Sequence, residues 1–508
     1  MLEIVVTCLL VLPVVITIAR GMLKRRYSNL PPGPAFSLFA TLSVVLQELH
    51  PSRVHLTLEK WAQEHGHLLH FQVLWKHFIV LNSAKLVRKV LVSEKYRDFT
   101  NSRKTCFRGI YFMWNHDVIL QGKYGEGYFK LRKYLSRGLT AYGHGVPVYE
   151  KDSEANVRWL VQKIKDTKRK DFDPKPIIKE AMANFISILL TGDFSVEKSE
   201  QIQDFLDTVL ETVEPSFETC MDTFPFLRFI PGTRSYNLCK KFQQIKDKVL
   251  STFYDKSKGS FHTEKTRGLV DALIRLQTED NSGGESKLSD NQIKGIILDA
   301  ISGALLTSTY GCVAAISSIM VREKCLATMR KEIDENIGSG RLPCSGHLAK
   351  LHYTHAVILE TLRYSSHIAT QPMKCTTKDI EVDGYTIPAE TGILVNVWSA
   401  HHDPDVWSDP WMFQPERFLD TNGHILPPTH ELRQLILSFG IGPRYCLGKS
   451  LGESWIFLTL ATLIQQFDLL PSSDGTLVSD DPHNYEGKGI IGPPKFMIKA
   501  KFRDSFSS

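Results

Sequence analysis

A single cysteine lies between a glycine-rich turn and an apolar run near the end of the chain. The stretch SFGIGPRYCLGKSLG, residues 438–452, contains Cys446, and none of the nine cysteines belongs to a C-x-x-C pattern. A cysteine nucleophile needs a partnered histidine and a flanking pattern that are absent here, and a zinc site needs further ligands nearby. The stretch therefore predicts a thiolate that binds iron.

The neighbours of this cysteine suit an axial thiolate, whose sulfur is stabilised by backbone amides in a tight loop. Gly440 and Gly442 would form the turn at low steric cost, and Phe439 would shield the sulfur from water. Arg444 would neutralise a haem propionate. Gly448 would let the following helix approach closely, and the dipole of that helix would favour the thiolate.

Two further motifs precede the cysteine loop. ETLR places Glu360 and Arg363 one helical turn apart, where they can pair, and PERF supplies Arg417. Buried charges must be fully paired, because a lone partner costs on the order of 3 to 5 kcal/mol. Together the motifs resemble those of the cytochrome P-450 family, whose signature F-x-x-G-x-Arg/His-x-Cys-x-Gly has all five fixed positions filled here. The resemblance implies that the Glu-Arg-Arg cluster supports the cysteine loop.

The resemblance extends over nearly the whole chain, and it is greatest to the steroid 17-alpha-hydroxylase and drug-metabolising group of microsomal members. It implies a mainly α fold with a small β region, in which haem b is held by Cys446. It also implies a monooxygenase that inserts one atom of dioxygen into a hydrophobic substrate, with electrons from NADPH passed on by a flavoprotein reductase. The reductase would dock on a basic face that comprises Lys130, Arg132, Lys133, Arg137, Arg433 and Lys449.

This chain departs from the family pattern where oxygen and the propionates would be handled. Thr307 is the expected hydroxyl that helps to supply protons, but the acid expected before it is Leu306. The small and polar residues around Thr307 predict a locally opened helix. Tyr128 and Arg132 occupy the usual Trp and Arg positions, and Lys374 replaces the usual propionate-binding Arg or His. Each replacement keeps a hydrogen-bond donor.

The resemblance also assigns a substrate pocket. Apolar and aromatic residues dominate its segments, which favours a hydrophobic ligand such as a steroid or a fatty acyl compound. The predicted lining comprises residues 107–120 and 217–232 together with Leu305, Ile368, Ala369, Thr370, Ile490 and Ile491.

Two other functions stay open at this point. A haem-thiolate isomerase or dehydratase that acts on a peroxide needs neither a reductase nor a proton relay, and it would explain Leu306. A non-catalytic haem-binding or sterol-binding protein is the other alternative.

The elements that must position this chemistry are mainly helical. LSDNQ, residues 288–292, has capping-box spacing at Ser289 and Gln292, and the apolar pattern that follows predicts a helix to about Val321. Strands are predicted within residues 67–82 and 379–397, and a flexible loop at residues 280–287.

The N-terminal residues predict a membrane anchor. Residues 4–19, IVVTCLLVLPVVITIA, are uncharged, and the basic RGMLKRR follows them. The basic cluster predicts that the catalytic domain stays in the cytosol. The resemblance to microsomal members implies a single-pass anchor in the endoplasmic reticulum membrane. We expect an anchor at residues 1–23, a basic and proline-rich hinge at 24–34 and one haem-thiolate catalytic domain at 35–508.

Charge and cysteine usage exclude other classes of protein. Across 508 residues, 61 Lys and Arg oppose 55 Asp and Glu, which is too small an excess to indicate a nucleic-acid partner. The odd number of widely spaced cysteines indicates no disulfide framework. The anchor predicts a lipid membrane as one partner, and the resemblance implies the reductase and a small hydrophobic substrate as the others.

Overall fold

The computed structural model describes residues 29–34, 53–73, 76–104, 118–211, 225–279, 287–476, 478–487 and 489–503. Several predictions lie outside these residues. They concern the anchor and the basic part of the hinge, the loop at 280–286, and most of the pocket segments 107–120 and 217–232.

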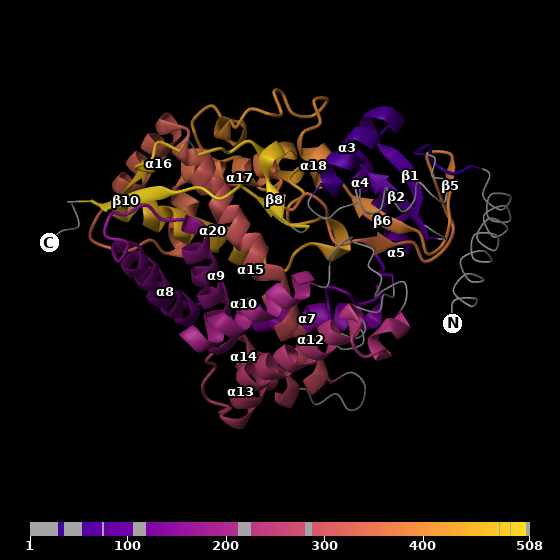
Figure 1. Cartoon of the computed structure of the whole chain (residues 1–508), viewed down its shortest axis with the longest axis horizontal. Helices are drawn as coiled ribbons and strands as arrows, with labels where there is room; N and C mark the ends of the chain where they lie inside the picture. Colours follow the sequence, from indigo (N-terminus) through magenta and orange to yellow (C-terminus); the bar gives the residue numbers. More distant parts are fainter. Residues whose placement is uncertain are drawn as a thin grey trace.

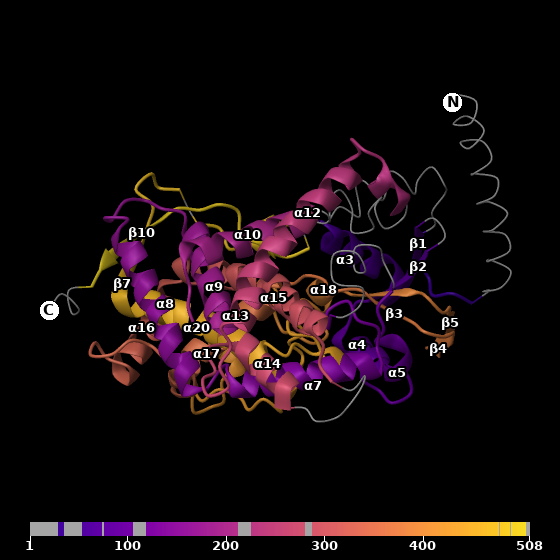
Figure 2. The same ribbon diagram turned by 90° about the horizontal axis from the view of Figure 1, so that it is seen from below.

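One long helix, α15 (Asp290–Met320), organises the fold. Ser289 caps it, and the predicted capping box with Gln292 is present. Its apolar residues continue all round, so most of the helix is buried, against α9 (Pro174–Thr191), α17 (His352–Ser365) and α20 (Lys449–Gln466). Figures 1 and 2 show α15 running through the middle of the molecule. The predicted long helix is confirmed.

The other helices surround this centre, mostly at the side away from the sheet (Figure 1). They are α3 (Val54–His65), α4 (Ala84–Leu91), α5 (Arg97–Thr100), α7 (Glu126–Ala141), α8 (Pro147–Lys165), α10 (Val196–Glu211), α12 (Arg234–Leu250), α13 (Lys256–Gly259), α14 (Leu269–Glu279), α16 (Glu323–Asn336), α18 (Val397–His401) and α19 (Glu431–Gln434). Short 3-10 turns at Pro415–Phe418 and Gly442–Arg444 lead toward the cysteine loop.

The principal sheet has the strand order β1 (Leu68–Val73), β2 (Lys76–Leu81), β6 (Gly392–Val395) and β3 (Lys374–Cys375). β2 and β6 pair in parallel although they are far apart in the sequence, and the other pairs are antiparallel. Small pairs form between β4 (Ile380–Val382) and β5 (Tyr385–Ile387), β7 (Phe467–Pro471) and β10 (Ile498–Phe502), and β8 (Glu486–Gly487) and β9 (Ile491–Gly492). The strands predicted within 67–82 and 379–397 are confirmed.

The described residues thus form one large, mainly helical domain with small sheets, as predicted. Among them, one helix is long and apolar enough to cross a membrane. This helix is α15, and most of its apolar stretch is buried inside the domain. Its hydrophobicity is therefore accounted for by the core.

Candidate functional site

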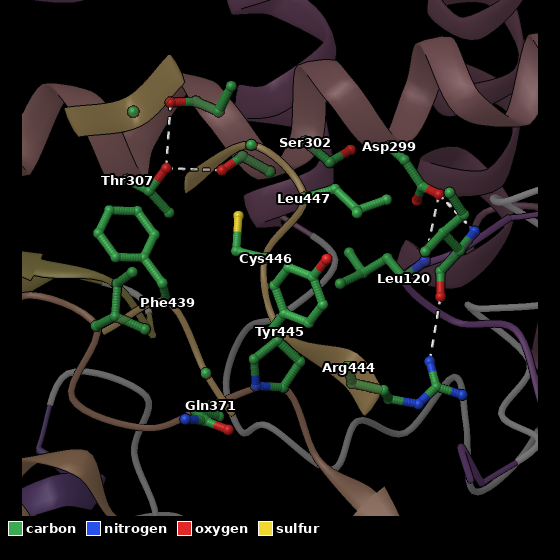
Figure 3. A pocket seen from close by; sticks show the side chains of 18 of the residues that line it. Leu120, Asp299, Ser302, Thr307, Gln371, Phe439, Arg444, Tyr445, Cys446 and Leu447 are labelled. Carbon is green, nitrogen blue, oxygen red and sulfur yellow. Dashed lines mark hydrogen bonds between the residues drawn. The ribbon is translucent and has the colours of Figure 1, made fainter. Parts of the chain in front are cut away.

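Cys446 lies in a short loop between the 3-10 turn Gly442–Arg444 and the start of α20 at Lys449. The carbonyl of Phe439 accepts the N–H of Cys446 at 2.8 Å and closes the loop. The Cys446 side chain is exposed to a cavity, in which Phe439 stands on one side of the sulfur (Figure 3). Because this cavity is not bulk water, burial raises the pKa of the thiol, and the main-chain N–H of Gly448 opposes that effect.

The turn before the cysteine requires glycine, as predicted. Gly440 and Gly442 both have φ of 68°, in the left-handed region that other residues rarely adopt. A Cβ at Gly442 would also lie 2.9 Å from the carbonyl oxygen of Leu91. Conformation and space therefore both exclude a side chain at Gly442.

That Gly448 permits a close helix approach stays a prediction. A Cβ at Gly448 would meet only the sulfur of Cys446, at an ordinary contact distance of 3.8 Å. Two other glycines lie close to neighbouring protein atoms. A Cβ at Gly452 would lie 3.4 Å from the Phe439 ring, and a Cβ at Gly311 of α15 would lie 2.9 Å from Ile456 of α20.

The predicted Glu-Arg-Arg cluster is present and buried. Arg363 donates to both carboxylate oxygens of Glu360 at 2.8 Å, and Arg417 Nε lies 3.4 Å from Glu360 Oε1. The N–H of Gln414 also donates to Glu360 Oε1, at 2.7 Å. Arg363 uses its remaining donors on the carbonyls of His401, Pro410 and Met412. The donors of Arg363 and the carboxylate of Glu360 are therefore all hydrogen-bonded, as burial of these charges demands.

His401 connects this cluster to the cysteine loop, and sequence reasoning missed it. Its carbonyl accepts from Arg363 at 2.9 Å, while its ring Nε2 accepts the N–H of Leu437 at 2.8 Å. Ser366 Oγ lies 2.9 Å from the other ring nitrogen, and Gln371 donates to the Leu437 carbonyl at 3.0 Å. Only the HHDP motif that contains His401 could have drawn attention to it.

The cavity in front of Cys446 has a volume of about 600 Å³. Most of its lining is apolar, with contributions from Leu120, Leu189, Leu362, Ile368, Ile456 and Ile490. Thr307 and its neighbours on α15 border the same space (Figure 3). The cavity volume lies within the range of small-molecule binding sites. A hydrophobic molecule can therefore lie between Cys446 and Thr307.

Basic side chains gather at one part of this lining. Of the described lining residues, four are cationic, Arg103, Arg132, Lys374 and Arg444, and one is acidic, Asp299. Burial, followed by mutual repulsion, lowers the pKa of Arg103 to about 9 and that of Lys374 well below its usual range. Within the described part of the chain none of these four cations forms a salt bridge, and a ligand with two carboxylates would balance them.

Tyr128 and the cationic residues also organise the cysteine loop itself. Tyr128 donates to the carbonyl of Pro443 at 2.9 Å, and Arg132 donates to that of Tyr445 at 3.0 Å. Arg444 donates to the carbonyls of Asn101, Ile119 and Gly122. Lys374 donates to Gln371 at 3.0 Å. Arg103, which holds the carbonyls of Leu120, Pro372 and Met373, was missed because no motif surrounds it.

The oxygen-handling turn of α15 differs from its prediction. Thr307 faces the cavity and donates to the carbonyls of Gly303 at 2.6 Å and Ala304 at 3.2 Å. The helix is unbroken from Asp290 to Met320, so the predicted local opening is wrong. Leu306 packs in the hydrophobic core and is not among the cavity-lining residues. It belongs to the other face of the helix, one residue or about 100° from Thr307.

The predicted substrate lining is right in part. Ile368, Thr370 and Ile490 border the cavity, whereas Leu305, Ala369 and Ile491 are buried in the core. Leu305, like Leu306, lies on a face of α15 that is turned away from the cavity. The segments that carry Ala369 and Ile491 alternate their side chains between cavity and core. Gly303, Ala304 and Ala300 of α15 form the lining in place of Leu305.

Asp299 is a functional candidate that sequence reasoning missed. It borders the cavity from α15, and its Oδ2 accepts the N–H groups of Ile119 at 2.6 Å and Leu120 at 3.2 Å (Figure 3). Its Oδ1 is buried without a partner among the described residues, and so is Oγ of Ser302, one turn further along. Burial raises the pKa of Asp299 to about 7. The helix thus presents two unsatisfied polar groups beside an apolar space.

Fold and site together define an α-helical protein with one cysteine sulfur facing a large apolar cavity, beside a cluster of cations. A family model described as Cytochrome P450 matches residues 31–500. The chain therefore belongs to the cytochrome P450 family, and it is a cytochrome P450 monooxygenase.

Curated relatives agree with this family. Cytochrome P450 2D28 of Mesocricetus auratus is 29% identical over 468 residues, which cover 89% of this chain and 90% of the relative. Steroid 17-alpha-hydroxylase/17,20 lyase of Gallus gallus is 28% identical over 487 residues, which cover 93% and 92%. Cytochrome P450 1A1 of Platichthys flesus is 25% identical over 449 residues, which cover 83% and 82%.

The family implies haem with cysteine thiolate ligation, and the residues present fit that group. The sulfur of Cys446 faces the cavity, where it would hold the iron. The four cations on the lining would hold the two propionates, whose charge they lack in the protein alone. Tyr128 would act through the cysteine loop, because its hydroxyl is bonded to Pro443.

Proposed function

We propose that this chain inserts one atom of dioxygen into a hydrophobic substrate, with electrons that originate in NADPH and arrive through a flavoprotein reductase. The observation that carries the proposal is that Cys446 and Thr307 border one apolar cavity. The haem, when bound, supplies the activation of dioxygen. The protein excludes water from the cavity, orients the substrate and offers the Thr307 hydroxyl as a proton donor.

The substrate we propose is apolar and carries one hydrogen-bonding group, such as a hydroxyl. Most of the lining is apolar, but Asp299 and Ser302 border it, and one side-chain oxygen of each is buried with no partner among the described residues. Along α15 they lie about 12 Å and about 8 Å from Thr307, because each helical residue adds about 1.5 Å. A polar group at one end of the substrate would satisfy them and place the other end near Thr307. Steroids and long-chain acyl compounds meet this description.

The reductase would approach the side of the molecule where the cysteine loop reaches the surface. Lys133, Arg137 and Lys449 are exposed there, and Tyr445 is 51% exposed beside the cysteine. Arg433 is turned inward, where it donates to the carbonyl of Leu426 at 2.8 Å, so we leave it out of the docking face. Exposed basic residues around an apolar centre suit an acidic partner.

For the setting, we propose the endoplasmic reticulum membrane, with residues 1–23 as a single-pass anchor and the catalytic domain in the cytosol. The support is the uncharged stretch 4–19 followed by the basic residues 20–26. An anchor would hold the domain at the lipid bilayer, in which hydrophobic substrates dissolve.

A second candidate is a reductase-independent isomerase or dehydratase that acts on a lipid hydroperoxide. Leu306 favours it, because this apolar residue precedes Thr307 where the family usually has an acid. The oxygen atoms of a peroxide substrate are already reduced, so no proton relay to dioxygen is needed.

One assay tests the thiolate ligation that both enzymes need, and two further assays separate them. The reduced protein with carbon monoxide is expected to show a thiolate-type Soret band, and Cys446→Ala is expected to abolish it. Substrate-dependent NADPH consumption with purified reductase, matched by a hydroxylated product, supports the monooxygenase. Turnover of a lipid hydroperoxide without reductase, with no NADPH-dependent product, would replace it by the isomerase.

A further inference from the structure

A buried histidine faces the same turn of α15 as Thr307. His367 lies two residues beyond the end of α17, is only 2% exposed, and borders the cavity. Its carbonyl accepts the N–H of Ile491 at 2.9 Å, which fixes its main chain from the far side. No motif in the sequence marks it, and the functions assigned above make no use of it.

The two nitrogen atoms of the His367 ring have different partners. Nδ1 lies 3.3 Å from Oγ of Ser365. The opposite edge faces α15, since a Cβ at Gly311 would lie 3.5 Å from both Cε1 and Nε2. Burial lowers the pKa of His367 to about 4, against the opposing effect of a hydrogen bond to the main chain of Thr307. The ring is therefore neutral at pH 7.

These contacts determine the tautomer. In an unbroken α-helix, the N–H of Gly311 bonds to the carbonyl of Thr307, so that carbonyl lies beside Gly311 and within reach of Nε2. A carbonyl oxygen can only accept, so Nε2 carries the hydrogen. Nδ1 then accepts the hydroxyl hydrogen of Ser365. The ring forms a bridge from the end of α17 to the Thr307 peptide.

This turn of α15 needs support from outside the helix. Gly303 and Gly311 flank Thr307, and each glycine destabilises a helix by about 1 kcal/mol relative to alanine. The Thr307 hydroxyl bonds to the Gly303 carbonyl, an interaction that tends to bend helices. The sequence therefore predicts an opening, whereas the helix is unbroken. The bridge from His367 supplies the missing constraint.

We propose that His367 is a positioning residue for Thr307. By donating to the Thr307 carbonyl, it holds this turn of α15 closed and fixes where the Thr307 hydroxyl stands in the cavity. The catalytic consequence rests on the proposed monooxygenase function. With Leu306 in place of an acid, proton delivery depends on that hydroxyl, so a displaced Thr307 releases reduced oxygen as hydrogen peroxide instead of using it on the substrate.

The test compares two substitutions at His367 in the full-length, haem-loaded protein. His367→Phe replaces the imidazole by an aromatic ring without nitrogen atoms. His367→Gln restores a hydrogen-bond donor of similar reach. His262→Phe, the same change at an exposed histidine, is the control. The first measurement is amide hydrogen exchange in residues 303–311, which needs no turnover. The second is the hydrogen peroxide released per NADPH consumed.

The proposal expects His367→Phe to exchange these amides about fivefold faster, the effect of one lost hydrogen bond, and to release more peroxide. His367→Gln is expected to stay close to the wild type in both measurements. Amide exchange at the wild-type rate in residues 303–311 of His367→Phe would overturn the proposal. Faster exchange with an unchanged peroxide fraction overturns the link to Thr307.

Two further observations keep the test decisive. If His367→Phe shows no thiolate-type Soret band and is misfolded, Ser365→Ala takes its place, because it removes only the partner of Nδ1. About a twofold rise in exchange is then expected, and no rise overturns the proposal. If the wild type forms no NADPH-dependent product, the monooxygenase function fails, while the exchange measurement still decides whether His367 holds the turn.

Discussion

The ring of His401 accepts the main-chain N–H of Leu437 at 2.8 Å, while the carbonyl of the same residue accepts from Arg363 at 2.9 Å. His401 thus joins the buried charge cluster to the segment that leads into the cysteine loop. The Glu-Arg-Arg cluster therefore reaches the loop through His401 rather than by touching Cys446.

Removing the ring of His401 is expected to loosen the cysteine loop. In His401→Ala the buried N–H of Leu437 has lost its acceptor, which costs about 1 to 3 kcal/mol. We expect a lower urea midpoint and a smaller fraction of protein with the thiolate-type carbon monoxide band. His424→Ala, a substitution at an exposed histidine, is the control. Equal midpoints for the two variants would contradict the role of His401.

Neutralising Glu360 is expected to destabilise the whole domain. Glu360 is fully buried between Arg363 and Arg417, so Glu360→Gln leaves two guanidinium groups without a counter-charge. The expected loss in the free energy of unfolding is about 3 to 5 kcal/mol. Glu154→Gln breaks an exposed pair with Arg158, and little change is expected. Chemical denaturation of both variants measures the difference, and similar losses would refute the assignment.

Gly442→Ala is expected to damage the cysteine loop more than the conformational strain alone predicts. Gly442 combines a φ of 68° with a collision of any Cβ against Leu91, whereas Gly423 has a φ of 78° and open space around it. Gly423→Ala therefore reports the strain without the collision. Haem content and thermal stability should fall clearly further for Gly442→Ala. Comparable values in the two variants would show that the loop can shift away from Leu91.

Asp299 is expected to make stability depend on pH. Its pKa is raised to about 7 by burial, above the usual 3.8, so the folded protein binds a proton between these values that the unfolded chain does not. Protonated Asp299 stabilises the folded state. The free energy of unfolding therefore falls as the pH rises from about 4 to about 7, by on the order of a few kcal/mol. Asp299→Asn should lack this loss. Urea denaturation at pH 5 and pH 8 measures it, and parallel changes in both proteins would contradict the prediction.

The same substitution tests the proposed polar end of the substrate. Asp299→Asn keeps an oxygen for Ile119 and Leu120 but changes the group that faces the cavity. A hydroxylated ligand should bind several-fold more weakly to the variant than to the wild type, and an analogue without the hydroxyl should bind both equally. Binding spectra of the ferric protein report this, and an equal loss for both ligands would place the hydroxyl elsewhere.

The sequence predicts well those features that are encoded locally. The capping box at Ser289 and the apolar run after it define α15, and the glycines before Cys446 define the turn of its loop. Glu360 and Arg363 pair because one helical turn separates them. In each case neighbours in the sequence are also neighbours in space.

Predictions that depend on the rotation of a buried element were less successful. α15 is apolar on all sides, so its pattern does not tell which face meets the cavity. The sequence indicates Leu305 and Leu306 for that face, whereas both pack in the core and Asp299, Ala300 and Ala304 border the cavity. Arg103, His367 and His401 act through partners that lie far away in the sequence. No local motif can reveal such contacts, because the fold alone brings the partners together.

The bond between His401 and Leu437 also has a bearing on how the chain folds. It joins residues separated by 36 positions, and the contact of Arg363 with the Met412 carbonyl spans 49. Closing such loops costs chain entropy before any contact rewards it. We therefore expect the pocket for the cofactor to mature late during refolding, so that haem added early finds no binding-competent chain. Delayed addition of haem to a refolding sample, with recovery of the thiolate-type band against time, measures that maturation.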